Sequence, residues 1–185
     1  MGRVSQAQAE ENRRRVVETA SRLFRERGTQ VSVADVMAAA GLTHGAFYKQ
    51  FASKEALVDE VTAYAFAELA QRHRAGLEQG YGQRAAQRSL IDAYLSVEHR
   101  DDPADGCPVA ALATDIARDG GGHEARRVYA EGVAEFADFL GGSDQDGILR
   151  LCTLFGALVL SRATKGFPLS EEILAAAHGA LTEPG

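Results

Sequence analysis

The residues best suited to bind nucleic acid lie in one short stretch of the chain. Their side chains carry hydroxyl, imidazole and ammonium groups, and one of them is a glycine. These residues are Thr43, His44, Gly45, Tyr48 and Lys49. No carboxylate occurs between Asp35 and Glu55. Hydroxyl and ammonium groups bind phosphate oxygens, and polar side chains that enter the major groove read base edges. The stretch therefore predicts contact with double-stranded DNA.

Two of these residues admit another interpretation. Tyr48 would be a core aromatic if it faced inward, but Phe47 and Phe51 already occupy the buried direction, so phosphate contact is favoured. His44 is either a base-contacting residue or a plain surface residue. Gly45 costs a helix about 1 kcal/mol relative to Ala, which makes sense if the backbone approaches DNA closely.

Charge is distributed unevenly along the 185 residues. The net charge is −6, yet residues 1–54 hold nine Lys and Arg against five Asp and Glu, a balance of +4. Residues 55–185 therefore carry −10. A basic segment in an acidic chain indicates nucleic-acid contact by the basic part, although a chance distribution over solvated helix faces gives the same pattern.

The segments around residues 43–49 are predicted to be helices. Apolar residues at helical spacing predict a first helix that stops at Gly28, after a basic last turn. Ser32 predicts the start of a second helix, which Gly41 ends. Thr43 is placed to cap a short third helix over residues 44–50, and Ser53 to cap a long fourth one. Two helices joined by a tight glycine turn are a helix-turn-helix arrangement.

The remainder of the chain also shows helical periodicity. Apolar stripes recur around residues 90–95, 109–116, 128–140, 148–159 and 173–181, with Ser143 and Ser170 at two expected helix starts. No stretch alternates with period two for long enough to form a strand. We therefore predict an all-α fold.

The N-terminal third resembles the DNA-binding domain of the TetR/AcrR family of bacterial transcriptional regulators. The resemblance is carried by RRVVETASRLF (14–24), Gly28, VADVMAAAGLTHGAFYKQF (33–51) and SKEAL (53–57). It implies a homodimer of about nine helices per chain, with a DNA-binding domain over residues 1–54. It also implies a helical ligand-binding and dimerisation domain over residues 55–185, which ends in a dimerising helix pair. It also implies phosphate contacts by Thr43, Tyr48 and Lys54, and base or groove contacts by His44, Gly45 and Lys49. Glu55 is expected to cap the fourth helix.

A ligand-responsive regulator needs a cavity for its effector. Candidate lining residues in the C-terminal part are Phe66, Tyr94, His99, Tyr129, Phe136 and Phe155. The alternative for each is an ordinary core aromatic, because aromatic residues at helical spacing mostly pack together. The identity of a small-molecule inducer cannot be read from these residues.

The chain has two cysteines. Cys107 precedes a helix with proline at its first position, where backbone dipoles lower a thiol pKa, so Cys107 is a candidate sensor of oxidants or electrophiles. Nearby aspartates oppose thiolate formation, and small buried cysteines are common. Cys152 lies on an apolar stripe and is expected in the core.

Other function classes find little support. The five histidines lack spacing suited to a metal, no phosphate-binding glycine loop or nucleophile motif occurs, and no enzyme or cofactor is indicated. No apolar run approaches the ~20 residues of a membrane helix, and two cysteines make no disulfide framework, so we expect a cytoplasmic protein that does not enter membranes.

The apolar stripes of the last two helices have two interpretations. Phe155, Gly156, Leu158 and Val159 suit close packing against a second copy, and the alternative is a monomeric core. The sequence thus predicts a homodimeric repressor that binds a palindromic operator and is released by a small molecule or electrophile. The rivals are an activator of the same family and a helical small-molecule-binding or enzymatic domain with a vestigial DNA reader.

Overall fold

The computed structural model describes residues 6–78, 82–118, 122–141 and 146–182, and within them every regular element is a helix. In chain order they are α1 (Gln6–Arg27), α2 (Val33–Ala39), η1 (His44–Lys49), α3 (Lys54–Glu78), α4 (Gly82–Tyr94), α5 (Val97–Asp101), α6 (Pro108–Ala117), α7 (His123–Gly141), α8 (Asp146–Ala163) and α9 (Pro168–Thr182). The predicted all-α fold is confirmed. Of the helices described here, none combines the length and the apolar character needed to cross a bilayer.

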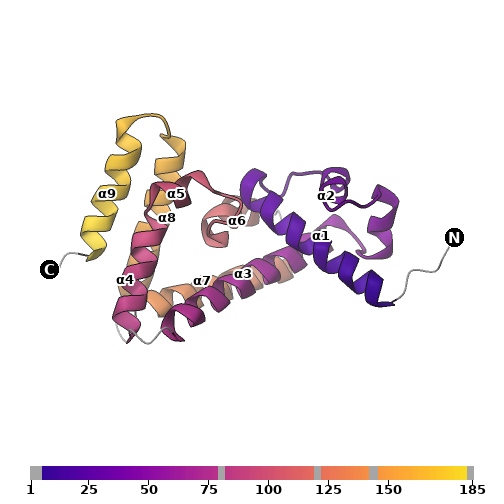
Figure 1. Ribbon diagram of the computed structural model, residues 1–185, viewed down its shortest axis with the longest axis horizontal. Coiled ribbons are helices and arrows are strands. Elements are labelled where there is room, and N and C mark those ends of the chain that lie inside the picture. Colours follow the sequence, from indigo (N-terminus) through magenta and orange to yellow (C-terminus); the bar gives the residue numbers. More distant parts are fainter. Residues whose placement is uncertain (1–5, 79–81, 119–121, 142–145, 183–185) are drawn as a thin grey trace.

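The helices form two groups joined by a long pair (Figure 1). α1, α2 and η1 gather at one end, and α4, α8 and α9 lie at the other. α3 and α7 run side by side between the two groups, and α6 lies next to α1. Each group has its own buried cluster. The cluster under α1, α2 and η1 also takes in Leu112 and Ile116 from α6, so α6 is part of the N-terminal core.

Local signals place the N-terminal helices as expected. α1 ends at Arg27, and Gly28 follows with a φ of 81°, a left-handed conformation that glycine adopts readily. The Ser32 hydroxyl accepts the backbone N–H of Asp35 at 3.1 Å and caps α2. Gly41, with a φ of 69°, makes the turn toward η1. The Ser53 hydroxyl accepts the backbone N–H of Ala56 at 3.2 Å at the start of α3.

Three expectations about helix ends differ from the structure. The third helix is a 3₁₀ helix over His44–Lys49, and Thr43 precedes it without a side-chain capping bond. The last helix begins at Pro168, two residues before Ser170. Ser170 is buried and donates instead to the Ser161 carbonyl at 2.7 Å, because a tertiary partner is available there. Ser143 lies outside the described residues. Cys152, expected in the core, is exposed on α8.

Candidate functional site

The predicted DNA-binding surface comprises Thr43, His44, Gly45, Tyr48, Lys49 and Lys54, and it is built around a buried aromatic pair. Phe47 is fully buried and stacks on Phe51 at a centroid distance of 5.3 Å. The next residue, Tyr48, is 66% exposed and meets the Phe47 ring edge-on at 5.2 Å. The two buried rings hold η1 against the core, so its outer side, including Tyr48, faces solvent.

Four other residues of the predicted DNA-binding surface are also exposed. Thr43, His44, Gly45 and Lys49 are exposed, and the imidazole of His44 contacts the Tyr48 ring edge-on at 5.8 Å. A Cβ added at Gly45 would have no atom within 4 Å in this chain. The fold therefore does not require glycine at this position, which is consistent with a requirement set by a partner.

Lys54 is the first residue of α3, where the helix dipole favours anions. The exposed carboxylate of Glu55 bonds its own backbone N–H and the Ser53 hydroxyl, and these bonds lower its pKa. Glu55 thus caps the helix, as expected, and Lys54 is the cation that this end of α3 presents to an anion.

Arg13 on α1 has a structural partner at this surface. Its guanidinium lies 4.4 Å from the centroid of the Phe51 ring, donates to the Gln50 carbonyl, and donates from Nε to Glu60 at 3.1 Å. Arg13 therefore ties the turn after η1 to α1 and α3. Sequence reasoning missed this contact, because it joins residues 37 and 47 positions apart.

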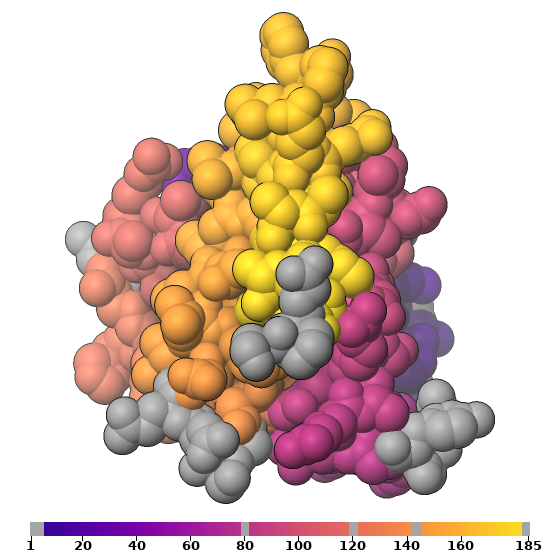
Figure 2. Space-filling view, turned by 90° about the vertical axis from the view of Figure 1, so that its left-hand side faces the viewer, coloured from indigo at the N-terminus to yellow at the C-terminus, as the bar shows by residue number. Residues whose placement is uncertain are grey.

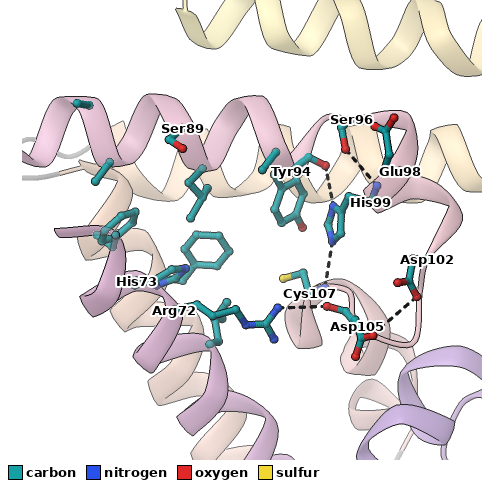
Figure 3. A pocket seen from close by; sticks show the side chains of 18 residues that line it. Arg72, His73, Ser89, Tyr94, Ser96, Glu98, His99, Asp102, Asp105 and Cys107 are labelled. Carbon is teal, nitrogen blue, oxygen red and sulfur yellow. Dashed lines mark hydrogen bonds between the residues drawn. The ribbon is translucent and has the colours of Figure 1, made fainter. Parts of the chain in front are cut away.

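A cavity of about 730 Å³ opens between α3, α4, α7 and the loop of residues 102–107, which connects α5 to α6 (Figure 3). Volumes of 300–1,000 Å³ are typical of sites for small organic ligands. The lining residues are Leu69, Arg72, His73, Gly76, Ala85, Ala86, Ser89, Leu90, Ala93, Tyr94, Ser96, Glu98, His99, Asp102, Asp105, Cys107, Phe136 and Phe139.

Three of the six predicted ligand residues, Tyr94, His99 and Phe136, line this cavity. The other three are absent from its walls. Phe66 occupies the space above Gly132 on α7, where an added Cβ would lie 2.0 Å from the Phe66 ring. Tyr129 packs edge-on against Phe66 at 5.5 Å and donates its hydroxyl to the Val109 carbonyl at 2.8 Å. Phe155 is half-buried on α8 against the C-terminal core.

His99 closes the inner end of the cavity and is fully hydrogen-bonded. Its Nδ1 lies 2.7 Å from the Tyr94 carbonyl, and its Nε2 accepts the backbone N–H of Cys107 at 3.2 Å. These partners assign a neutral ring with the proton on Nδ1. Burial lowers the pKa of His99, in agreement. His99 therefore holds the loop of residues 102–107 in place and has no free nitrogen for a ligand.

Cys107 precedes α6 and is buried with its thiol in the cavity wall (Figure 3). Burial raises the pKa of this thiol and outweighs the backbone N–H groups of Val109 and Ala110, which lower it. The expected pKa-lowering effect of the helix start is thus present but is overcome by desolvation.

The Tyr94 hydroxyl faces the same space. Its oxygen is buried and has no oxygen or nitrogen partner among the described residues, and the Cys107 thiol is the polar group that acts on it. Burial, and then Cys107, raise the pKa of Tyr94 well above its ordinary value, so the hydroxyl stays protonated. A buried donor without a partner costs about 1–3 kcal/mol, which a bound acceptor would recover.

The apolar end of the cavity is flat and aromatic. The His73 ring stacks on Phe139 at 4.5 Å, with 13° between the planes, and lies 4.6 Å from Phe136. Burial lowers the pKa of His73 to about 4, so the ring is neutral at physiological pH. Neither His73 nor Phe139 was predicted, because both depend on how α3 crosses α7.

The loop of residues 102–107 also contacts the N-terminal group of helices. Asp105 forms an ion pair with Arg22 of α1, and the buried Arg25 of α1 donates to the Gly106 carbonyl at 3.4 Å. On the cavity side, Arg72 donates to the Asp105 carbonyl at 3.2 Å. One short loop therefore joins the cavity wall to α1.

Comparisons with known proteins agree with this architecture. Residues 16–61 match the family described as bacterial regulatory proteins, tetR family. The transcriptional repressor KstR2 of Rhodococcus jostii (strain RHA1) is 34% identical over 80 residues, a match that spans 43% of this chain and only 39% of that protein.

Solved structures match over nearly the whole chain. A TetR transcriptional regulator from Chloroflexus aurantiacus J-10-FL is 25% identical with a TM-score of 0.76, covering 95% of this chain and 94% of that one. AibR, solved with isovaleryl coenzyme A and operator DNA, is 17% identical with a TM-score of 0.65, covering 94% and 100%. The chain is thus similar to TetR-family bacterial regulators, in sequence over residues 16–61 and in fold over nearly its whole length.

Proposed function

We propose that the protein is a dimeric transcriptional repressor that binds a palindromic operator and leaves it when a small molecule occupies the cavity. The observation that carries the proposal is the exposed DNA-binding surface, held outward by the stacked Phe47 and Phe51 rings. Its hydroxyl and ammonium groups match phosphate oxygens, and its small and polar side chains fit the major groove.

The second copy is proposed to bind at α8 and α9, which lie side by side at the end of the molecule seen in Figure 2. Large apolar side chains are exposed on these helices and on the turn between them: Ile148, Leu149, Val159, Leu160, Phe167 and Leu169. Several large apolar side chains exposed on two adjacent helices are typical of an interface. A two-fold axis through this face would leave both DNA-binding surfaces free.

The loop of residues 102–107 and α6 offer a route from the cavity to DNA. A ligand that displaces the loop would act on Arg22 and Arg25 of α1. On α6, Asp115 accepts the backbone N–H of Thr29 at 2.6 Å, which ties α6 to the end of α1. Half-sites lie ~34–36 Å apart on DNA, so a small rotation of each N-terminal group would prevent both from docking at once.

The names of the relatives support the same assignment. KstR2 is described as a transcriptional repressor, and the AibR complex holds isovaleryl coenzyme A together with operator DNA. A chain of this fold thus binds a small molecule and an operator DNA in at least one case.

A gel-shift assay with the DNA that flanks its own gene tests the proposal. We expect a complex of two chains per site whose affinity falls steeply as salt rises, because bound phosphates release counterions. The double variant Tyr48→Phe/Lys54→Ala should bind at least about ten-fold more weakly, with a shallower salt dependence, since it lacks one ammonium and one hydroxyl per subunit. Absent or salt-insensitive binding would instead favour a small-molecule-binding or enzymatic protein with a vestigial reader.

Sensing of oxidants or electrophiles by Cys107 stays a prediction. The thiol is buried and its pKa is raised, so we expect slow alkylation of the folded protein, by a reagent that enters through the cavity. The variant Cys107→Ser should remain on operator DNA under treatment with an electrophile that releases the unmodified protein. Cys152→Ser, which changes the exposed cysteine, is the matched control. Release of the Cys107→Ser protein from DNA would end the idea.

A further inference from the structure

The cavity has two chemically different ends. Figure 3 shows His73 at one end, and Glu98, Asp102 and Asp105 at the other, with Tyr94 between them. The first end is walled by aromatic and aliphatic side chains: Leu69, His73, Ala86, Leu90, Phe136 and Phe139. Because His73 is neutral, this end carries no charge, and the stacked faces of His73 and Phe139 favour a flat ligand.

The Tyr94 hydroxyl faces the cavity next to this aromatic end, where the buried Nε2 of His73 also lacks a partner and the Ser89 hydroxyl also lines the wall. The Tyr94 hydroxyl is buried to more than nine-tenths and has no oxygen or nitrogen partner among the described residues. His99, the nearest polar ring, already uses both of its nitrogens. A ligand therefore meets a donor at Tyr94, and an oxygen acceptor on the ligand satisfies it.

The charged groups at the other end disfavour an anion. Glu98 and Asp102 line the cavity, and neither has an ion-pair partner within the described ranges. Asp105 is paired with Arg22, and Arg72 is the one guanidinium among the lining residues in the described part of the chain. An anionic ligand would lie near two unpaired carboxylates and a single cation, so its charge would be repelled.

We propose that the cavity binds an uncharged, flat, largely aromatic compound whose carbonyl oxygen accepts a hydrogen bond from Tyr94. The proposal deepens the proposed function, and it rests on that function only in treating the ligand as the effector that releases DNA. The flat rings lie against His73 and Phe139, the carbonyl points to Tyr94, and the volume of about 730 Å³ accommodates two or three fused rings with substituents.

Prodan, an uncharged naphthalene ketone, is a suitable probe, because its emission moves to shorter wavelength in apolar surroundings and to longer wavelength when its carbonyl accepts a hydrogen bond. Titration of the free full-length protein should show saturable binding of one Prodan per chain. Anilinonaphthalene sulfonate, an anion with the same ring system, should bind at least about ten-fold more weakly. Equal or tighter binding of the sulfonate would overturn the proposal.

The variant Tyr94→Phe isolates the hydrogen bond. We expect about five-fold weaker binding of Prodan, because one neutral hydrogen bond is lost. We also expect the emission of bound Prodan to shift further to shorter wavelength. Tyr129→Phe is the matched control, because it removes a hydroxyl that does not line the cavity, and both properties should stay unchanged. Bound emission that is the same in Tyr94→Phe as in the unmodified protein would refute the assignment of the donor.

Two further variants keep the test decisive if Tyr94→Phe does not fold. Ala93→Leu places a larger side chain in the cavity from the exposed side of α4 and should weaken Prodan binding at least about ten-fold. Glu98→Gln removes one rim carboxylate and should strengthen binding of the sulfonate relative to that of Prodan. If the protein binds Prodan but no operator, the regulatory role is refuted and the ligand assignment stands. If it binds the operator but not Prodan, the ligand assignment is refuted and the regulatory role stands.

Discussion

Replacing Lys49 with Glu should weaken operator binding by roughly 100-fold at moderate salt. Lys49 ends η1, is exposed, and lies one residue after the outward-facing Tyr48. A carboxylate there would be repelled by phosphates or by acceptor edges in the groove. The substitution is present in both subunits of a dimer. A roughly ten-fold loss of affinity at each of the two half-sites therefore multiplies to roughly 100-fold. Fluorescence anisotropy with labelled operator DNA over a salt series gives the affinities.

Arg74→Glu is a matched control for this charge reversal. Arg74 is exposed near the C-terminal end of α3, the helix whose first residue is Lys54, and its side chain donates to the Ala70 carbonyl at 3.3 Å. The variant changes the net charge by the same amount, so it should lower affinity only slightly through the overall field. Similar losses in the two variants would mean that overall charge, not the surface around η1, governs binding.

Gly147→Ala should destabilise the protein by about 3 kcal/mol, the largest effect that we expect from adding one methyl group. Gly147 lies in the first turn of α8, where α8 crosses α7. A Cβ there would lie 2.0 Å from the Ala137 carbonyl oxygen and 2.9 Å from the Gly141 nitrogen, and both are backbone atoms that cannot turn aside. The helices would have to separate, with loss of packing along the C-terminal core.

Urea denaturation followed by circular dichroism, at one fixed protein concentration, measures this effect. Gly76→Ala is the control, because Gly76 is also helical but its added Cβ would be 4.0 Å from the nearest atom, the Ala86 Cβ. That variant should be neutral, or more stable by up to about 1 kcal/mol from helix propensity. Equal urea midpoints of unfolding for the two variants would contradict the close approach of α7 and α8.

The sequence determined the N-terminal elements because their signals are local. The Ser32 cap, the left-handed glycines at 28 and 41 and the alternation of buried Phe47 with exposed Tyr48 each act within a few residues. Such signals survive any change in distant packing. The same locality explains why the resemblance of the first third to a known family was sufficient to predict the fold.

The tertiary structure alone decided what lines the cavity. Phe66, Tyr94 and Tyr129 are all aromatic residues on helices and are indistinguishable by spacing, yet only Tyr94 reaches the cavity. Phe66 packs against α7 because Gly132 has no side chain in the space that its ring occupies. The direction of a side chain depends on the space that the facing helix provides. The periodicity of a single helix does not contain this information.

The properties of Cys107 were likewise set by packing. Its place before α6 predicts a lowered thiol pKa, but the pKa is raised because burial in the C-terminal core excludes water from the sulfur. Helix position is a property of the sequence, whereas desolvation is a property of the assembled core. The charge state of a buried group therefore follows only once its neighbours are known.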